Sequence, residues 1–151
     1  MEKATVYLSL GTNLGNKEQN LLRAIEEIQK RIGDVKAQSA FLHTEPWGFE
    51  SENTFLNAAV RVETILAPLD LLHATQQIER QMGRTCKSAN REYHDRIIDI
   101  DILQYYPAAG YPVGSLLVDE DGLHISSAEL TIPHPLMNER DFVLIPLSEI
   151  K

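Results

Sequence analysis

The 151-residue sequence is poor in cysteine and tryptophan, with one of each, Cys86 and Trp47. A single cysteine excludes an intrachain disulfide, and the natural setting of such a chain is a reducing cytoplasm. The five histidines show no His-x-x-His spacing and no Cys-x-x-Cys pair exists, so the sequence contains no zinc pattern. The length is that of one ordinary domain with its own hydrophobic core, which we expect to span residues 1–151.

Long apolar runs and basic residues are also scarce. No apolar run approaches the about 20 residues of a membrane-spanning helix, and the first residues lead directly into a short strand, so we expect neither an anchor nor a signal peptide. The 14 Lys and Arg residues against 22 Asp and Glu give a net charge of −8. A general nucleic-acid binder displays a basic face, so the net charge argues against a nucleic-acid partner. We expect a cytoplasmic monomer that binds small molecules and has no membrane partner.

The feature that the rest of the chain is organised around is a buried-strand sequence that contains two carboxylates. The run from Ile97 to Leu103 is β-branched and of strand length, so its isoleucines should alternate with Asp99 and Asp101 across the two faces. The two acids are then neighbours on one face, with Cα atoms about 6.6 Å apart and a repulsion of roughly 3 kcal/mol at an effective dielectric constant of about 20. A positive group is expected between them.

Two kinds of positive group suit the acid pair. Mg²⁺ takes oxygen ligands, is often held by one or two carboxylates, and completes its coordination with water and substrate phosphates. Arg96 is the other candidate, and a solvated sheet face on which the acids pair with Arg or Lys is the simplest alternative. A basic segment, with Arg84, Lys87, Arg91 and Arg96 in 13 positions, leads into the strand. In an acidic protein this segment indicates a site for one small polyanion, although a basic surface loop would look the same.

The hydrophobic periodicity predicts a β-α-β-β-α-β order. Strands are expected at 5–10, 35–44, 55–63 and 97–103, and helices between Asn13 or Asn16 and Gly33 and between Pro68 and Gly83. Residues 107–129 are expected to form a β-hairpin excursion, and residues 132–147 a turn, a short helical piece and a final strand. The predicted fold is therefore α+β and ferredoxin-like, with one antiparallel sheet and helices packed on a face.

Three further segments are candidates for ligand contacts. Phe55 and Asn57 are neighbours on one strand face, where an aromatic ring and an amide can stack on and pair with a flat heterocycle, although a core Phe and a strand-end Asn are the alternative. Residues 45–53 combine proline, glycine and two aromatics, as loops that close over ligands often do, although Trp47 can equally pack in the core. Residues 11–15 could cradle phosphate, but they lack the P-loop Lys-Ser/Thr, so a structural turn is favoured.

Five separated stretches together resemble one family, 6-hydroxymethyl-7,8-dihydropterin pyrophosphokinase. They are Gly11-Thr12-Asn13-Leu14-Gly15, Phe55-Leu56-Asn57-Ala58-Ala59-Val60, Ile78-Glu79 with Gly83-Arg84, Arg96-Ile97-Ile98-Asp99-Ile100-Asp101-Ile102, and Pro133-His134-Pro135 with Arg140-Asp141-Phe142-Val143. The resemblance covers almost the whole chain. It implies an enzyme of folate biosynthesis that moves a pyrophosphoryl group from MgATP to the hydroxymethyl oxygen of the pterin and releases AMP.

The resemblance also implies roles for individual residues. Asp99 and Asp101 would bind two Mg²⁺ ions, and Arg84 and Arg96 would grip phosphate oxygens, which makes these four the expected catalytic residues. The nucleotide would be bound by Gln76, Glu79, Arg84, Lys87, Tyr93, Arg96, Ile102, Thr131, His134 and Arg140. The pterin would be bound by Thr44, Pro46, Trp47, Gly48, Phe55, Asn57 and Phe142.

The sequence departs from the family pattern in places. Tyr93-His94-Asp95-Arg96 stands where the family commonly has Trp-Gly-Pro-Arg, the 107–129 excursion is long, and Glu129 occupies a place where a basic nucleotide contact can occur. Two other functions remain open from the residues alone. One is a metal-dependent nucleotidyltransferase, which would release pyrophosphate instead of AMP, and the other is a non-enzymatic, ligand-sensing ferredoxin-like module.

Overall fold

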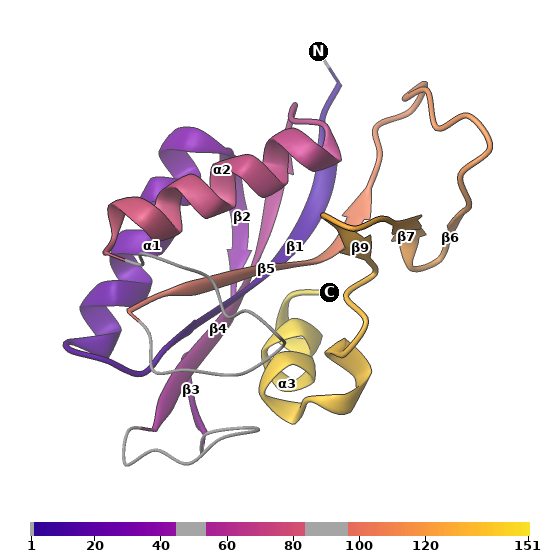
Figure 1. Ribbon diagram of the computed structural model, residues 1–151. Helices are drawn as coiled ribbons and strands as arrows, with labels where there is room; N and C mark the ends of the chain where they lie inside the picture. Colours follow the sequence, from indigo (N-terminus) through magenta and orange to yellow (C-terminus); the bar gives the residue numbers. More distant parts are fainter. Residues whose placement is uncertain (1, 45–53, 84–96) are drawn as a thin grey trace.

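The computed structural model describes residues 2–44, 54–83 and 97–151, and an antiparallel sheet lies at its centre (Figure 1). The sheet order is β2 (Gly33–Gln38), β4 (Phe55–Thr64), β1 (Ala4–Thr12) and β5 (Asp99–Tyr106), and β3 (Leu42–Thr44) also pairs with β4. All of these pairings are antiparallel. The predicted α+β class is therefore correct, and the strand order is compatible with the predicted ferredoxin-like arrangement.

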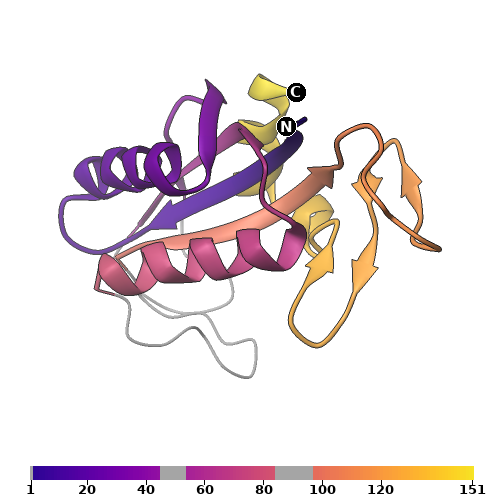
Figure 2. The same cartoon turned by 90° about the horizontal axis from the view of Figure 1, so that it is seen from above.

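Helices α1 (Lys17–Arg31) and α2 (Pro68–Gln81) cover one face of the sheet (Figure 2). They bury apolar residues at helical spacing, such as Leu21 and Ile28 of α1, against the alternating apolar residues of the strands. The predicted starts are confirmed, because the Asn16 side chain accepts a hydrogen bond from the Gln19 backbone N–H and Pro68 opens α2. No helix in the described part of the chain is long and apolar enough to cross a membrane.

The final strand predicted within residues 132–147 is wrong. After a 3₁₀ turn, η1 (Met137–Glu139), which matches the predicted short helical piece, the chain forms helix α3 (Asp141–Ile150) on the opposite face of the sheet from α1 and α2. The β-branched residues Val143 and Ile145 favour a strand by composition alone. The helix forms because Val143, Leu147 and Ile150, spaced at i, i+4 and i+7, make one apolar face that is buried against the sheet.

The predicted second strand is also corrected, since the structure divides it into β2 and β3. Between them Ser39 is still bonded to Ala59 of β4. Its backbone N–H donates to the Ala59 carbonyl oxygen at 2.9 Å, and its side-chain Oγ accepts from the Ala59 backbone N–H at 2.9 Å. The Ala40 backbone N–H donates to Glu149 Oε1 of α3 at 2.9 Å. The third helix therefore takes part in holding the break between the two strands.

The 107–129 segment contains the predicted hairpin and the first strand of a second hairpin. Strand β6 (Val118–Asp119) pairs with β7 (Gly122–Leu123), and β8 (Ile125–Ser126) pairs with β9 (Thr131–Ile132). After β9 the His134 backbone N–H donates to the Leu103 carbonyl oxygen at 2.9 Å, which fixes this part of the chain along the outer edge of β5 (Figure 1).

Candidate active site

The register of the three central strands places the predicted acid pair and the predicted heterocycle site in adjacent positions. Gly11 of β1 lies opposite Asn57 of β4 on one side and opposite Asp99 of β5 on the other. Residues directly opposite each other in a sheet direct their side chains to the same face. Asn57, Gly11 and Asp99 therefore form one row across the sheet, which we call the site row.

The next row fixes which face carries the site. Ser9 lies opposite Ala59 and Asp101, so these residues share the face of the site row. Ala59 packs in the apolar cluster that α3 covers, whereas Ile100 is buried in the cluster beneath α1 and α2. The predicted alternation of β5 is confirmed, and the two acids lie, partly buried, on the α3 face.

The residues present suit a hard divalent cation. The two positions opposite Asp99 and Asp101 are Gly11 and Ser9, two of the smallest residues, so β1 places no bulky side chain of its own directly opposite either carboxylate. The described residues contain no group of three or more His, Cys, Asp or Glu side chains that could enclose a metal. Mg²⁺ fits such an open pair, because it is commonly bound by one or two carboxylates together with water and substrate phosphates.

The other end of the site row has the groups needed to recognise a flat ring. Asn57 is 2% exposed, and its Nδ2 donates to Thr44 Oγ1 at 2.7 Å, which fixes the orientation of the amide. A Cβ placed on Gly11 would lie 3.7 Å from Cδ1 of Phe55, so the Phe55 ring reaches over the glycine. Asn57 and Phe55 thus meet above Gly11, on the side of the row away from the acids.

Helix α3 contributes an aromatic ring and a buried cation to this face. Phe142 is partly buried and packs against the apolar cluster that lies between α3 and the sheet. The Arg140 guanidinium carbon lies 5.6 Å from the centre of the Phe142 ring, within the range of a cation–π contact. Arg140 is 5% exposed, and burial lowers the pKa of its guanidinium to about 10, so it remains charged at neutral pH.

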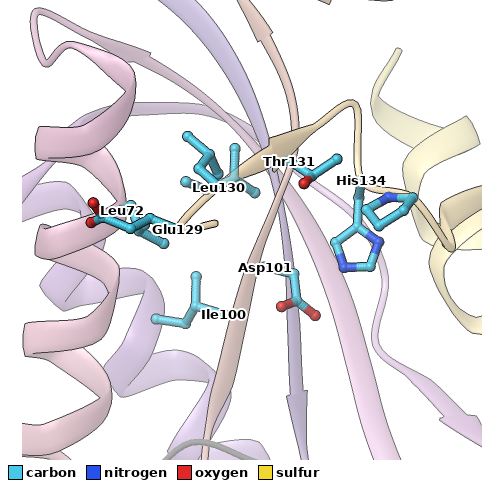
Figure 3. Close-up of a pocket in the computed structure, with 9 residues that line it drawn as sticks. Leu72, Ile100, Asp101, Glu129, Leu130, Thr131 and His134 are labelled. Carbon is cyan, nitrogen blue, oxygen red and sulfur yellow. The ribbon is translucent and has the colours of Figure 1, made fainter. Parts of the chain in front are cut away.

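A cavity of about 180 Å³ opens beside the outer edge of β5 (Figure 3). It is lined by Leu72, Ile100, Asp101, Ile102, Glu129, Leu130, Thr131, His134 and Pro135. Figure 3 shows Leu72 and Glu129 on one side of the cavity and Asp101 and His134 on the other. The cavity thus combines an apolar part with a polar part that contains one of the two site acids.

The backbone of β5 faces this cavity with its hydrogen-bonding groups. The Ile100 N–H donates away from β1, to Oε2 of the buried Glu79 at 2.8 Å. Alternate residues of a strand direct their N–H groups to the same side, so the Ile102 N–H also points outward at the cavity. His134 accepts a hydrogen bond from the Leu136 N–H at Nδ1, at 3.2 Å, so its neutral ring carries the proton on Nε2.

The structure brings several predicted nucleotide-site residues together and gives one of them a structural contact. Ile102, Thr131 and His134 line the cavity together with Asp101, and Gln76 lies partly buried on α2. Glu79 holds the β5 backbone between the two acids. The predicted residues Pro46, Trp47, Gly48, Arg84, Lys87, Tyr93 and Arg96 lie outside the described residues.

Sequence reasoning missed three residues of this site. Gly11 was assigned to a strand-to-helix turn, but β1 continues through it to Thr12, and Gly11 is the centre of the site row. A glycine inside a strand pattern signals a close approach of another group, which was the available clue. Leu72 and Leu130 were not among the predicted site residues, because no local pattern distinguishes a cavity wall from the core.

Comparison with known proteins identifies the family of the chain. The model of the 7,8-dihydro-6-hydroxymethylpterin-pyrophosphokinase (HPPK) family matches residues 7–151. Two relatives carry the name 2-amino-4-hydroxy-6-hydroxymethyldihydropteridine pyrophosphokinase. The protein from Porphyromonas gingivalis is 49% identical over 97% of this chain and 90% of its own length. The protein from Bacillus subtilis is 36% identical over 95% of this chain and 76% of its own length.

Solved structures agree at the level of the fold. A structure described as HPPK-DHPS in complex with substrates superposes with a TM-score of 0.68 at 16% identity, over 99% of this chain. A Plasmodium falciparum HPPK-DHPS structure gives 0.65 at 18% identity, over 97%. In both comparisons the chain spans 40% of the length of the solved chain, and at this identity the likeness concerns the fold alone.

Proposed function

Because the chain belongs to the HPPK family, we propose that the site row and the β5 cavity bind its two substrates on either side of the acid pair. The reaction of the family is the transfer of pyrophosphate from ATP to the hydroxymethyl group of 6-hydroxymethyl-7,8-dihydropterin, in folate biosynthesis, and this is the activity of the chain. The resemblance seen in the five sequence motifs and the predicted enzyme are thus confirmed. The roles of the individual residues are our proposal.

One observation supports the assignment above all others, namely that Asn57, Gly11 and Asp99 occupy one row. Moving across the sheet from β4 to β5, one meets in order a ring-binding pair, a glycine, the acids and a cavity with an apolar wall. The reaction needs the same order, which is pterin ring, hydroxymethyl group, the β-phosphate with the γ-phosphate attached to it, and then the α-phosphate with adenosine. In this proposal the sheet would hold the acceptor and the donor end to end, with the reacting atoms above Gly11 and Asp99.

At the pterin end, Phe55 and Phe142 would stack on the ring and Asn57 would pair with its edge. Phe55 comes from β4 and Phe142 from α3, which covers the same face of the sheet, so the two side chains belong to the same side of the molecule. The Asn57 amide is fixed by Thr44, and a fixed donor and acceptor select a ring edge better than a mobile one.

At the nucleotide end, the cavity would hold the adenosine. The outward N–H of Ile102 and the neighbouring carbonyl groups of β5 offer the paired donor and acceptor that a purine edge requires, while Leu72 and Leu130 provide the apolar walls. His134 lies on the Asp101 side of the cavity in Figure 3 and Thr131 belongs to the same lining, so these two residues would meet the sugar and phosphates.

The chemistry is a displacement at the β-phosphorus of ATP. The pterin hydroxyl oxygen forms a bond to that phosphorus and loses its proton, the bond from phosphorus to the α,β-bridging oxygen breaks, and AMP leaves. Asp99 and Asp101 would hold Mg²⁺, two ions in our proposal, which supplies neutralisation of the phosphate charge and alignment of its oxygens. The protein contributes mainly positioning, since phosphoryl transfer requires little covalent chemistry from side chains.

We further propose that the chain is a single domain, residues 1–151, that acts as a cytoplasmic monomer on small molecules. The single cysteine supports a reducing compartment, and the acidic net charge supports small-molecule ligands over nucleic acid.

The deciding experiment is incubation with MgATP and the hydroxymethyl pterin, followed by identification of the released nucleotide. AMP is expected, whereas pyrophosphate would indicate a nucleotidyltransferase and no product would indicate a binding module. Asp99→Asn and Asp101→Asn should each lower turnover at least about a hundredfold at saturating Mg²⁺, because both would hold the metal. Glu120→Gln, which removes one negative charge from the exposed turn between β6 and β7, is the matched control and should leave turnover unchanged.

A further inference from the structure

The first turn of α1 is bonded to the ends of two strands of the site. Lys17 Nζ donates to the backbone oxygen and to Oγ1 of Thr54, both at 3.1 Å. Asn20 Nδ2 donates to Thr12 Oγ1 at 3.1 Å and to the Leu14 carbonyl at 2.8 Å. Because Lys17 and Asn20 are three residues apart, they lie on the same side of the helix. One helical turn therefore ties the end of β1 to the start of β4.

The two anchored positions are next to residues that form the pterin end of the site. Thr54 immediately precedes Phe55, the first residue of β4, and Thr12 immediately follows Gly11. Phe55 also pairs with Thr44, the last residue of β3, so it stands at the end of a strand ladder where pairing is least cooperative. The bonds from Lys17 hold the backbone at this point from the side of the helix.

Lys17 is an unusual residue for its local position. It is the first residue of α1, where the helix macrodipole is positive and disfavours a cation. Its ammonium group turns to two oxygens of Thr54, 37 positions away in the sequence. The bond to Thr54 therefore explains a lysine at this position better than helix formation does.

We propose that Lys17 is a positioning residue for the pterin, acting through Thr54 to fix the backbone and ring of Phe55. This inference rests on the proposed placement of the pterin at Phe55 and Asn57. In this role the ammonium group acts on Thr54 and not on a substrate. It restrains the first residue of β4, so that the stacking face is already in place when the ring arrives. Loss of the restraint raises the entropy lost on binding, which weakens pterin binding and leaves the nucleotide cavity unaffected.

The test compares Lys17→Met with Lys30→Met, a matched control on the exposed last turn of the same helix. Binding of the pterin and of a non-hydrolysable ATP analogue is measured by calorimetry, and steady-state kinetics gives both KM values. Lys17→Met should raise the pterin Kd and KM about fivefold to tenfold, as expected for loss of a charge-assisted bond, with the ATP values and kcat unchanged. Lys30→Met should behave as the unaltered protein, and Lys17→Arg should recover most of the loss.

Two further variants keep the outcome decisive. Thr54→Val removes Oγ1, one of the two Thr54 oxygens that accept from Lys17. It should also weaken pterin binding, and it provides a second test if Lys17→Met folds poorly. Phe55→Ala tests the proposed function itself. If Phe55→Ala leaves pterin binding unchanged, the pterin placement is wrong. If Phe55→Ala weakens pterin binding but Lys17→Met does not, the positioning role of Lys17 is wrong. The role is also wrong if Lys17→Met weakens binding of the pterin and of the ATP analogue equally.

Discussion

Replacing Gly11 by alanine is the sharpest test of the site row, because the added methyl group meets the site and little else. The Cβ would lie 3.1 Å from Asn57 Oδ1 and 3.7 Å from Phe55 Cδ1. The first distance is a few tenths of an ångström shorter than an ordinary carbon–oxygen contact, so the Asn57 amide must move by about that amount. Asn57 cannot move freely, because it is 2% exposed and its Nδ2 is bonded to Thr44 Oγ1 at 2.7 Å.

The expected cost falls on pterin binding. Displacing one fixed hydrogen-bonding group and filling space above the row should cost about 1–2 kcal/mol, or roughly a tenfold rise in the pterin Kd. Global stability should change little, because Gly11 is not one of the glycines with a positive φ, and replacing glycine in an extended strand gains about 0.4–1 kcal/mol through the unfolded state. Binding of a non-hydrolysable ATP analogue, measured by calorimetry, should be unchanged.

Gly33→Ala is the matched control, since the same change at another strand glycine affects the fold and not the site. A Cβ there would lie 2.0 Å from the Glu63 backbone oxygen, so β2 and β4 must separate locally. We expect a loss of roughly 1–3 kcal/mol in urea unfolding and an unchanged pterin Kd for the folded fraction. If Gly11→Ala binds pterin as tightly as the unaltered protein, or loses both ligands equally, the reasoning from the site row is refuted.

Three further predictions concern stacking, the β5 backbone and pH. Phe142→Ala should weaken pterin binding by roughly 1–3 kcal/mol in calorimetry with little change for the ATP analogue, and equal weakening of both would indicate a damaged core instead. Glu79→Ala removes the acceptor of the buried Ile100 N–H and should lower the free energy of unfolding by about 1–3 kcal/mol, whereas Glu79→Gln, which retains an acceptor oxygen, should cost less. Burial raises the pKa of Tyr105 to about 12, so this hydroxyl ionises at a lower pH in the unfolded chain than in the folded chain. The contribution of Tyr105 to stability is therefore complete below about pH 10 and should be lost as the pH rises to about 12. Urea unfolding between these pH values should show a weaker decline in Tyr105→Phe, and an identical decline would contradict the assignment.

The β5 strand shows how much local pattern can establish. Its β-branched run predicted the strand, the alternation placed Asp99 and Asp101 together, and the like charges required a cation nearby; the strand and its alternation were confirmed. These inferences hold because side-chain alternation is a property of the extended backbone and needs no knowledge of neighbouring strands.

The C-terminal segment shows where local pattern fails. The run around Val143 and Ile145 has the composition of a strand, yet it forms α3. A short apolar run fits both the helical and the strand periodicity, so the choice between helix and strand depends on which surface is available to bury the run. Here an open face of the sheet accepts a helix whose buried side is Val143, Leu147 and Ile150.

The sequence by itself determined the fold class and the family, since each depends on residue identity and spacing along the chain. It also predicted the chemical types of group in the site. Tertiary structure alone decided that Gly11 joins Asn57 to Asp99, that Leu72 and Leu130 line a cavity, and that Lys17 reaches Thr54. These relations join residues that are tens of positions apart. They are fixed by strand register and by the packing of α1 and α2 on the sheet, which no short stretch of sequence specifies.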